Sequence, residues 1–304
     1  MVVRGRRVLM VVLGFLLSVF LGGGAFGVCS EAHGSTYSMK LPQAPGQVVY
    51  EGGQAVIDVS NAEDGYMMIK YTGSSSARLK VLIKGPKGTD FNYDLNNKGE
   101  YDVFPFSDGN GEYSVGVYQN TSGTKYATLL TKRISVNLSS EFAPFLVPNQ
   151  YVNYTASSKT VALGQELTGK SQTTMDKIAA VYIFVTKNIS YDREKAATVQ
   201  SGYVPDVDLI IDKKKGICFD FASVMASMLR SQGIPTRLVI GYAGTAYHAW
   251  LDVYTTETGW VEAVVFFDGK TWQLMDPTFA SGMSSAGLAR YIGDGKNYKV
   301  KFYG

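Results

Sequence analysis

The sequence predicts a multidomain protein in which an all-β domain precedes an α+β domain. Its 304 residues are enough for about two domains, and 45% of them are apolar, so composition does not indicate disorder. Short alternating apolar runs fill residues 46–138, whereas helical periodicity appears in residues 166–304. We therefore expect a β-sandwich at 46–138, a connector at 139–165 and an α+β domain at 166–304.

The chain begins with a segment that has the composition of a secretory signal peptide. Three arginines in the first seven residues precede an apolar run from Val8 to Leu21, and small residues follow. We expect residues 1–30 to be removed on export, which would place the mature protein outside the cell, secreted or at the cell surface. An uncleaved anchor is the alternative, because residues 8–28 would just span a bilayer. A membrane contact is expected through this leader alone.

Without the leader, the charge of the chain is balanced. Three of the 29 basic residues and none of the 26 acidic residues lie in residues 1–30, so 26 of each remain. No basic excess is left to neutralise phosphates, which argues against a nucleic-acid partner. Past residue 33 the chain holds one cysteine, Cys218, and one histidine, His248. The folded body therefore has no internal disulfide, and an unpaired thiol in an exported protein favours a working nucleophile.

The first domain is expected to be an antiparallel sandwich of immunoglobulin-like type. Its strands alternate apolar and polar residues, and turn clusters at residues 85–88 and 108–111 separate them. Three oxygen-bearing side chains near the second cluster could be read as calcium ligands, but a glycine-rich hairpin turn explains them better. They are Asp108, Asn110 and Glu112. We expect neither a metal nor a cofactor, and the connector at 139–165 is marked by Pro144 and Pro148.

In the second domain, Cys218 is expected to open a helix that runs to Ser231. Ala222, Met225 and Leu229 follow at i+4, i+7 and i+11. The unpaired N–H groups and the positive dipole end of a helix start favour a thiolate. The lysines at 213–215 add positive charge and Asp220 opposes them. A plain core cysteine is the alternative, because free cysteine is often buried.

His248 and Asp276 complete the set of residue types that thiol catalysis needs. His248 lies in a strand-like segment in which every second residue from Ala249 to Val253 is aliphatic, so the imidazole faces the other side. Asp276 ends a strand from Lys270 to Met275, after an Asp-Gly hairpin signal. Each residue alone has an ordinary explanation, as a surface histidine or a turn aspartate. Together with the thiol they supply a nucleophile, a base and an orienting carboxylate.

These residues also carry a family resemblance. Residues 215–242 read KGICFDFASVMASMLRSQGIPTRLVIGY, and HAW and W-x-x-x-DPT follow. This pattern resembles the core of the transglutaminase-like superfamily, whose fold is similar to that of papain-type cysteine peptidases; the resemblance covers roughly residues 165–280. It implies that Cys218 is the nucleophile, His248 the general base and Asp276 the carboxylate that orients the imidazole. An upstream helix over residues 178–189, with a capping box at Thr173 and Asp176, belongs to the same match.

The predicted activity is acyl transfer through a thioester. The Cys218 thiolate would attack a carboxamide or peptide carbonyl; an amine acceptor would give a cross-link, and water would give deamidation or hydrolysis. On the resemblance, we expect glutamine donors in protein or cell-wall peptide substrates. The Cys218 N–H is the first candidate for the oxyanion donor and Tyr203 the second. A peptidase or amidase of the same fold, and a non-catalytic surface-binding module, are the alternatives.

Overall fold

The computed structural model describes residues 37–243, 246–262, 265–267, 272–274 and 298–304. The chain divides into two units, Met1–Thr36 and Tyr37–Gly304. The predicted leader at 1–30 and the aspartate Asp276 lie outside the described residues. Among the helices that the structure describes, none combines the length and apolar character needed to cross a bilayer.

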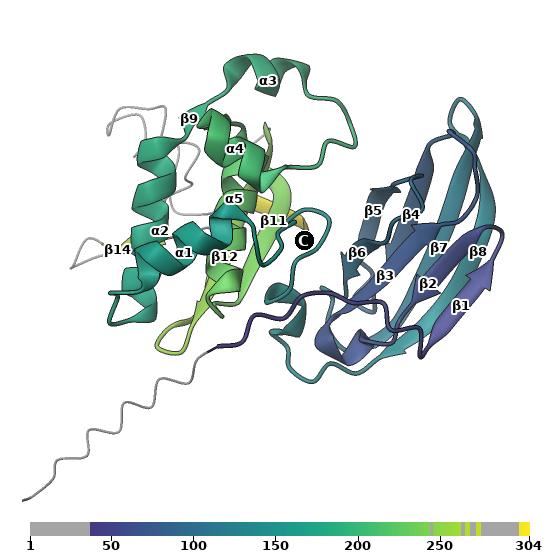
Figure 1. The fold of residues 1–304 in the computed structure, drawn as a ribbon, viewed down its shortest axis with the longest axis horizontal. Helices are drawn as coiled ribbons and strands as arrows, with labels where there is room; N and C mark the ends of the chain where they lie inside the picture. The colour runs from purple at the N-terminus through teal and green to yellow at the C-terminus, as the bar shows by residue number, and fades with distance from the viewer. Residues whose placement is uncertain (1–36, 244–245, 263–264, 268–271, 275–297) are drawn as a thin grey trace, which may run out of the picture. The chain divides into compact units, whose positions relative to one another are not determined.

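The first half of the described chain consists of two four-stranded antiparallel sheets (Figure 1). One sheet has the order β1-β2-β3-β6 and contains β1 (Val49–Gly52), β2 (Ala55–Asp58), β3 (Tyr66–Tyr71) and β6 (Asp102–Pro105). The other has the order β5-β4-β7-β8 and contains β5 (Asp90–Leu95), β4 (Leu79–Lys84), β7 (Gly111–Ser122) and β8 (Lys125–Val136). Two short 3-10 helices accompany them, η1 (Ala62–Asp64) and η2 (Ala143–Phe145). The all-β character agrees with the sequence, and the immunoglobulin-like class stays a prediction.

Strand β4 illustrates how the sequence alternation positions these sheets. Leu79, Val81 and Ile83 are buried, whereas the residues between them are partly or fully exposed. A period of two is what places one set of side chains in the core and the other in solvent. At the neighbouring turn, Asp108 accepts the Thr89 hydroxyl at 2.8 Å. Its other oxygen accepts the Lys87 N–H at 3.2 Å, so the carboxylate is bonded to the turn at residues 85–88.

In the second half, the described residues form five helices and several small sheets, so the expectation that this domain contains both helices and strands is confirmed. The helices are α1 (Lys159–Thr168), α2 (Thr174–Asn188), α3 (Arg193–Thr198), α4 (Val207–Lys213) and α5 (Cys218–Ser231). The main sheet has the order β13-β12-β11-β16, from β13 (Gly259–Val261), β12 (Ala246–Thr255), β11 (Thr236–Ala243) and β16 (Tyr298–Tyr303). A parallel pair joins β9 (Ser190–Tyr191) to β10 (Lys215–Gly216), and a hairpin joins β14 (Val265–Phe267) to β15 (Trp272–Leu274).

Helix α5 is the central element of this half, and its bounds are those that the sequence predicts. Every residue from Asp220 to Ser231 is buried, because α5 packs against α1, α2 and α4 and against strands β11 and β12. Fully burying one side chain such as Met225 or Leu229 stabilises the fold by roughly 1.5–3 kcal/mol. The position of Cys218 at the start of α5 is therefore fixed by a helix that cannot shift without disturbing the core.

The predicted capping box of α2 is also confirmed. The Thr173 hydroxyl accepts the Asp176 N–H at 3.1 Å, and the Asp176 carboxylate accepts the Thr173 N–H at 3.1 Å. The apolar stripe that follows is buried and packs against α5. Because the cap satisfies two of the N–H groups that a helix start leaves unpaired, α2 begins at a defined residue.

A buried arginine links the far end of α5 to distant parts of the chain. Arg230 is fully buried, and its guanidinium donates to the carbonyl oxygens of Thr236 at 2.9 Å, Val147 at 2.9 Å and Gly304 at 2.8 Å. Burial lowers the pKa of Arg230 to about 10. These three contacts join the start of β11, the residues before α1 and the last residue of the chain to a single side chain.

Candidate active site

Cys218 is the first residue of α5, and its free thiol is partly exposed. The chain reaches it through β10, which pairs with β9, and through Ile217 in extended conformation. Just before β10, Lys214 ends α4 in the left-handed region at φ 51°. The nucleophile candidate therefore lies where a short strand turns directly into a buried helix, with the helix N–H groups next to it.

The glycine two residues before Cys218 is required by its surroundings. A Cβ added to Gly216 would lie 2.6 Å from the Asp220 Cβ, closer than non-bonded carbon atoms approach. The Gly216 carbonyl oxygen also accepts the Asp192 N–H at 2.8 Å. The Gly-x-Cys-x-Asp pattern thus has a steric cause. The backbone at Gly216 lies against the side chain of Asp220, the third residue of α5, and leaves no room for a Cβ.

Asp220 is completely buried beneath the start of α5 and accepts three hydrogen bonds. Its Oδ2 accepts the Ile217 N–H at 2.8 Å and the Lys195 ammonium at 2.5 Å. Its Oδ1 accepts the Tyr203 hydroxyl at 2.6 Å. From the sequence, Asp220 is a charge that opposes the Cys218 thiolate; in the structure this charge is paired with Lys195. No short-range pattern joins residues 25 positions apart, so sequence reasoning misses the pair.

Tyr203 belongs to the hydrogen-bond network that Asp220 and Lys195 form. Its hydroxyl accepts the Lys195 ammonium at 2.6 Å while donating to Asp220, and the ammonium lies 4.2 Å from its ring centroid. Burial, followed by the hydrogen bond to Asp220, raises the pKa of Tyr203. The one hydroxyl hydrogen is used by Asp220, so in this structure Tyr203 is not placed as an oxyanion donor. The Cys218 N–H remains the candidate.

His248 lies in β12, opposite Gly241 of β11, and is buried with 7% of its surface exposed. Its ring stacks on that of Trp250, with centroids 6.3 Å apart. The alternating neighbours Ala249 and Leu251 belong to the large hydrophobic core, whereas Trp250 packs with a separate small cluster. The expectation that His248 lies on the side of β12 opposite the aliphatic residues is therefore confirmed.

Cys218 and His248 lie on two elements that pack together, α5 and β12. The pKa of Tyr247, the residue before His248, is raised first by burial, then by Tyr242 and then by Cys218. This part of β12 is thus within electrostatic reach of the start of α5. Asp276 lies outside the described residues, although the backbone of the strand leading toward it is described up to Leu274. The catalytic roles of the three residues stay predictions.

Two of the hollows in the described part of the chain border charged side chains. The larger, of about 660 Å³, lies between α3, α4 and the loop that joins them, and Lys195, Tyr203 and Ile210 are among its lining residues. It borders the network beneath Cys218. Its walls combine apolar side chains with lysines, so the hollow is chemically mixed.

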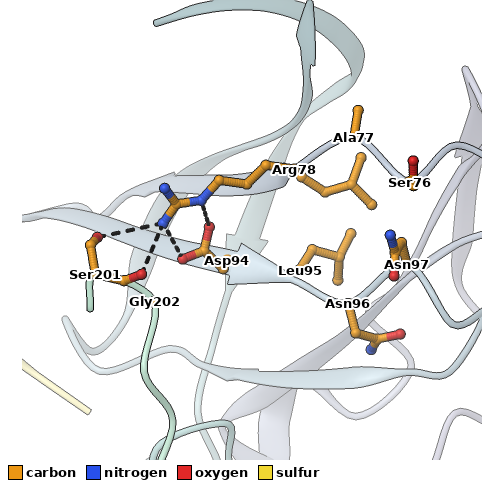
Figure 2. A pocket seen from close by; sticks show the side chains of 10 residues that line it. Ser76, Ala77, Arg78, Asp94, Leu95, Asn96, Asn97, Ser201 and Gly202 are labelled. Carbon is orange, nitrogen blue, oxygen red and sulfur yellow. Dashed lines mark hydrogen bonds and ion pairs between the residues drawn. The ribbon is translucent and has the colours of Figure 1, made fainter. Parts of the chain in front are cut away.

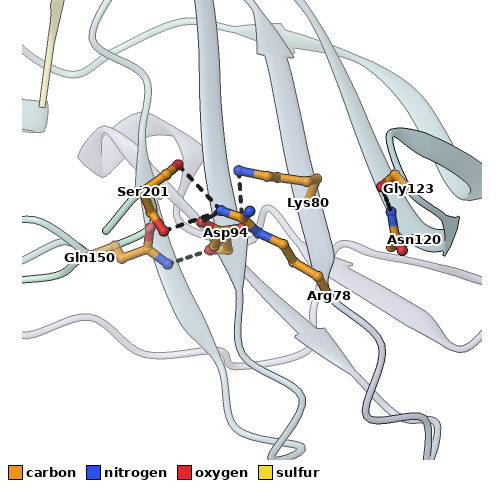
Figure 3. Close-up of polar contacts among 7 residues, drawn as sticks. All are labelled: Arg78, Lys80, Asp94, Asn120, Gly123, Gln150 and Ser201. Carbon is orange, nitrogen blue, oxygen red and sulfur yellow. Dashed lines mark hydrogen bonds and ion pairs between the residues drawn. The ribbon is translucent and has the colours of Figure 1, made fainter. Parts of the chain in front are cut away.

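The smaller hollow, of about 390 Å³, lies beside Arg78 and Asp94 of the first half of the chain (Figure 2). The Arg78 guanidinium donates to both Asp94 oxygens at 2.7 and 2.8 Å and reaches Ser201 at 3.4 Å. Lys80 adds a second cation at 3.0 Å from Asp94 (Figure 3). The charges in this hollow satisfy one another and no thiol or imidazole lines it, so it is not our candidate active site.

Comparisons with known proteins agree with the sequence resemblance. The family model of the transglutaminase-like superfamily matches residues 161–277, a range that includes Cys218, His248 and Asp276. YebA of Bacillus subtilis (strain 168) is 28% identical over 181 residues, which are 52% of this chain and 24% of that protein. A protein-glutamine gamma-glutamyltransferase of Pseudomonas aeruginosa is 27% identical over 113 residues, which are 32% of this chain and 16% of that protein. The chain thus spans less than a quarter of either relative.

Among solved structures, the periplasmic domain of TgpA from Pseudomonas aeruginosa bound to ethylmercury is similar to this chain. The two are 16% identical with a TM-score of 0.35, over 75% of this chain and 96% of that domain.

Proposed function

We propose that this chain, which carries a transglutaminase-like domain at residues 161–277, is a secreted thiol-dependent acyl transferase that acts on glutamine carboxamides. The observation that supports the proposal most is the position of Cys218. It is a partly exposed free thiol, it begins a buried helix, and that helix packs against the strand that carries His248. Such a helix start favours the thiolate, which is the nucleophilic form of cysteine.

In the proposed first half-reaction, the Cys218 sulfur forms a bond to the carboxamide carbon, and the carbonyl electron pair moves to oxygen. The tetrahedral species then collapses, the C–N bond breaks, and His248 delivers its proton to the departing ammonia. A thioester on Cys218 remains. Asp276 is assigned the role of holding the imidazole, and the Cys218 N–H that of a donor to the oxyanion.

In the second half-reaction, a primary amine attacks the thioester, His248 accepts its proton, and the thiol is released with a new amide bond. Water in place of the amine gives deamidation. The glutamine donor is supported by the similarity to the protein-glutamine gamma-glutamyltransferase of Pseudomonas aeruginosa, and we extend it to protein or cell-wall peptide substrates. Export is supported by the leader sequence, and a mature N-terminus between Val28 and Glu31 would establish it.

The test is an incubation of glutamine-containing peptides with a labelled primary amine, read by mass. We expect amine incorporation, which Cys218→Ala abolishes and His248→Ala nearly abolishes, whereas Asp276→Ala leaves a residual rate. Because the residues act as a unit, the Cys218→Ala/His248→Ala double variant should be no worse than Cys218→Ala alone. An active Cys218→Ala protein would refute the mechanism. A gain of about one dalton would indicate deamidase, backbone cleavage would indicate peptidase, and inertness of both peptide and thiol would favour the binding module.

A further inference from the structure

We infer that Lys195 and Asp220 form a partly buried charge pair that sets the acidity of the Cys218 thiol, with both acting as positioning residues. The inference rests on the proposed function in treating Cys218 as the nucleophile. It goes further by assigning a role to two side chains outside the predicted Cys-His-Asp set. Asp220 shapes the helix start, and Lys195 cancels the electrostatic cost of having a carboxylate there.

The side chain of Asp220 holds the backbone at the start of α5, which requires a hydrogen-bond acceptor at this position. Its Oδ2 accepts the Ile217 N–H at 2.8 Å, which fixes the residue directly before Cys218. The side chain of Asp220 has no exposed surface, whereas that of Lys195 is 28% exposed. A buried carboxylate without a partner is strongly unfavourable, so the Lys195 ammonium offsets the cost of burying Asp220 beneath the helix.

The same carboxylate acts on the thiol. Asp220 lies two residues after Cys218 in the first turn of α5, and a nearby negative charge disfavours formation of a thiolate. Lys195 contributes a positive charge at 2.5 Å from the carboxylate, so the thiol experiences a pair that is nearly neutral as a whole. The positive end of the α5 dipole is then left to act on Cys218.

Other titratable groups also face this end of α5. On β12, the pKa of Tyr247 is raised by burial, by Tyr242 and by Cys218, and His248 is the next residue of that strand. From the strand pair before the helix comes Lys215, whose ammonium is bound to Asp192 at 3.2 Å. Since Lys215 is directed to Asp192, Lys195 is the cation that meets Asp220.

Tyr203 ties the pair to its surroundings. Its hydroxyl contacts both partners at 2.6 Å, and its ring packs on that of Phe219, with centroids 6.3 Å apart. The network therefore connects α3 and the loop after it to the two residues that follow Cys218. A change in Lys195 is expected to affect the thiol through charge, whereas Tyr203→Phe keeps both charges and should change the thiol acidity less.

A double-mutant cycle on the full chain tests the inference. The thiol pKa is obtained from the pH dependence of the alkylation rate with iodoacetamide, with labelling of Cys218 read by mass. We expect Lys195→Met to raise the thiol pKa by roughly half to one pH unit, which lowers the thiolate fraction about three- to tenfold at pH values well below the pKa. Asp220→Asn should lower the thiol pKa by a similar amount, and the double variant should return close to wild type.

Opposite signs distinguish an electrostatic role from a structural one, because loss of packing would shift both single variants in the same direction. Lys195→Arg should restore most of the wild-type value. Lys40→Met is a matched control, since it removes an exposed lysine that pairs with Asp64 in the first half of the chain, and it should leave the thiol pKa unchanged. Equal signs, or no shift in Lys195→Met, would overturn the inference.

The inference can be tested even if one variant does not fold or the proposed function fails. If Asp220→Asn does not fold, the comparison of Lys195→Met with Lys195→Arg still tests the inference. A thiol pKa that is raised in Lys195→Met but not in Lys195→Arg supports the charge pair. Equal thiol pKa values in the two variants refute it. Failure of the proposed function is distinguishable, because it would appear as a lack of amine incorporation by the wild type. The thiol pKa values of the variants would be measured independently of any substrate.

Discussion

Replacing Arg230 by methionine should destabilise the fold severely. The change removes three charge-assisted hydrogen bonds of 2.8–2.9 Å. The oxygens of Val147 and Thr236 lose this donor, whereas the Gly304 oxygen keeps the Leu238 N–H at 3.2 Å. Each unsatisfied buried acceptor costs roughly 1–3 kcal/mol, and methionine recovers part of this because a buried charge no longer has to be desolvated. We expect a net loss of about 3 kcal/mol.

The assay is urea unfolding of the full chain followed by tryptophan fluorescence, with the midpoint and slope fitted together. Arg133→Met serves as the control, because the Arg133 side chain is 79% exposed and its ion pair with Glu112 is 3.5 Å long. That control should change stability by less than about 0.5 kcal/mol. A loss below about 1 kcal/mol for Arg230→Met would show that the three carbonyl contacts do not hold these segments together.

Two further perturbations follow from the structure. Burial tends to raise the pKa of Asp94, but the hydrogen bonds from Arg78 and Lys80 outweigh it and lower that pKa. The Asp94 pair thus contributes stability above the unfolded carboxyl pKa of about 3.9 and loses it as the pH falls through the lower folded value. Asp94→Asn should cost roughly 0.5–1 kcal/mol at pH 7 in urea unfolding, and a cost that persists unchanged at pH 2 would contradict this. Gly216→Ala should destabilise by roughly 1–3 kcal/mol in the same assay, because the new methyl group would lie 2.6 Å from the Asp220 Cβ; wild-type stability would show that the helix start adjusts freely.

Features that depend on neighbouring residues could be predicted from the sequence. The helix from Cys218 to Ser231 has the predicted bounds, because apolar spacing and a following glycine are local signals. The capping box at Thr173 and the strand around His248 could be predicted for the same reason, since each depends on residues within about four positions.

Features that depend on tertiary contacts could not be predicted. Helix α1 lies largely within the segment that the sequence assigns to the connector, and a glycine in its middle, Gly164, weakens the local helical signal. The structure supplies the reason for that glycine: an added Cβ would lie 2.9 Å from the Met228 carbonyl oxygen, because α1 packs closely on α5. The Lys195–Asp220 pair and the contacts of Arg230 likewise join residues far apart in sequence, so no periodic pattern predicts them.

The most direct test of the central claim is the mass of Cys218 after reaction with a glutamine-containing peptide in the absence of an amine. We predict that the peptide becomes attached to the protein through Cys218 with loss of ammonia, and that adding a primary amine releases it as the amine adduct. Cys218→Ala should form no adduct. A wild-type protein that turns the peptide over without any adduct on Cys218, or an adduct that persists in Cys218→Ala, would contradict the account.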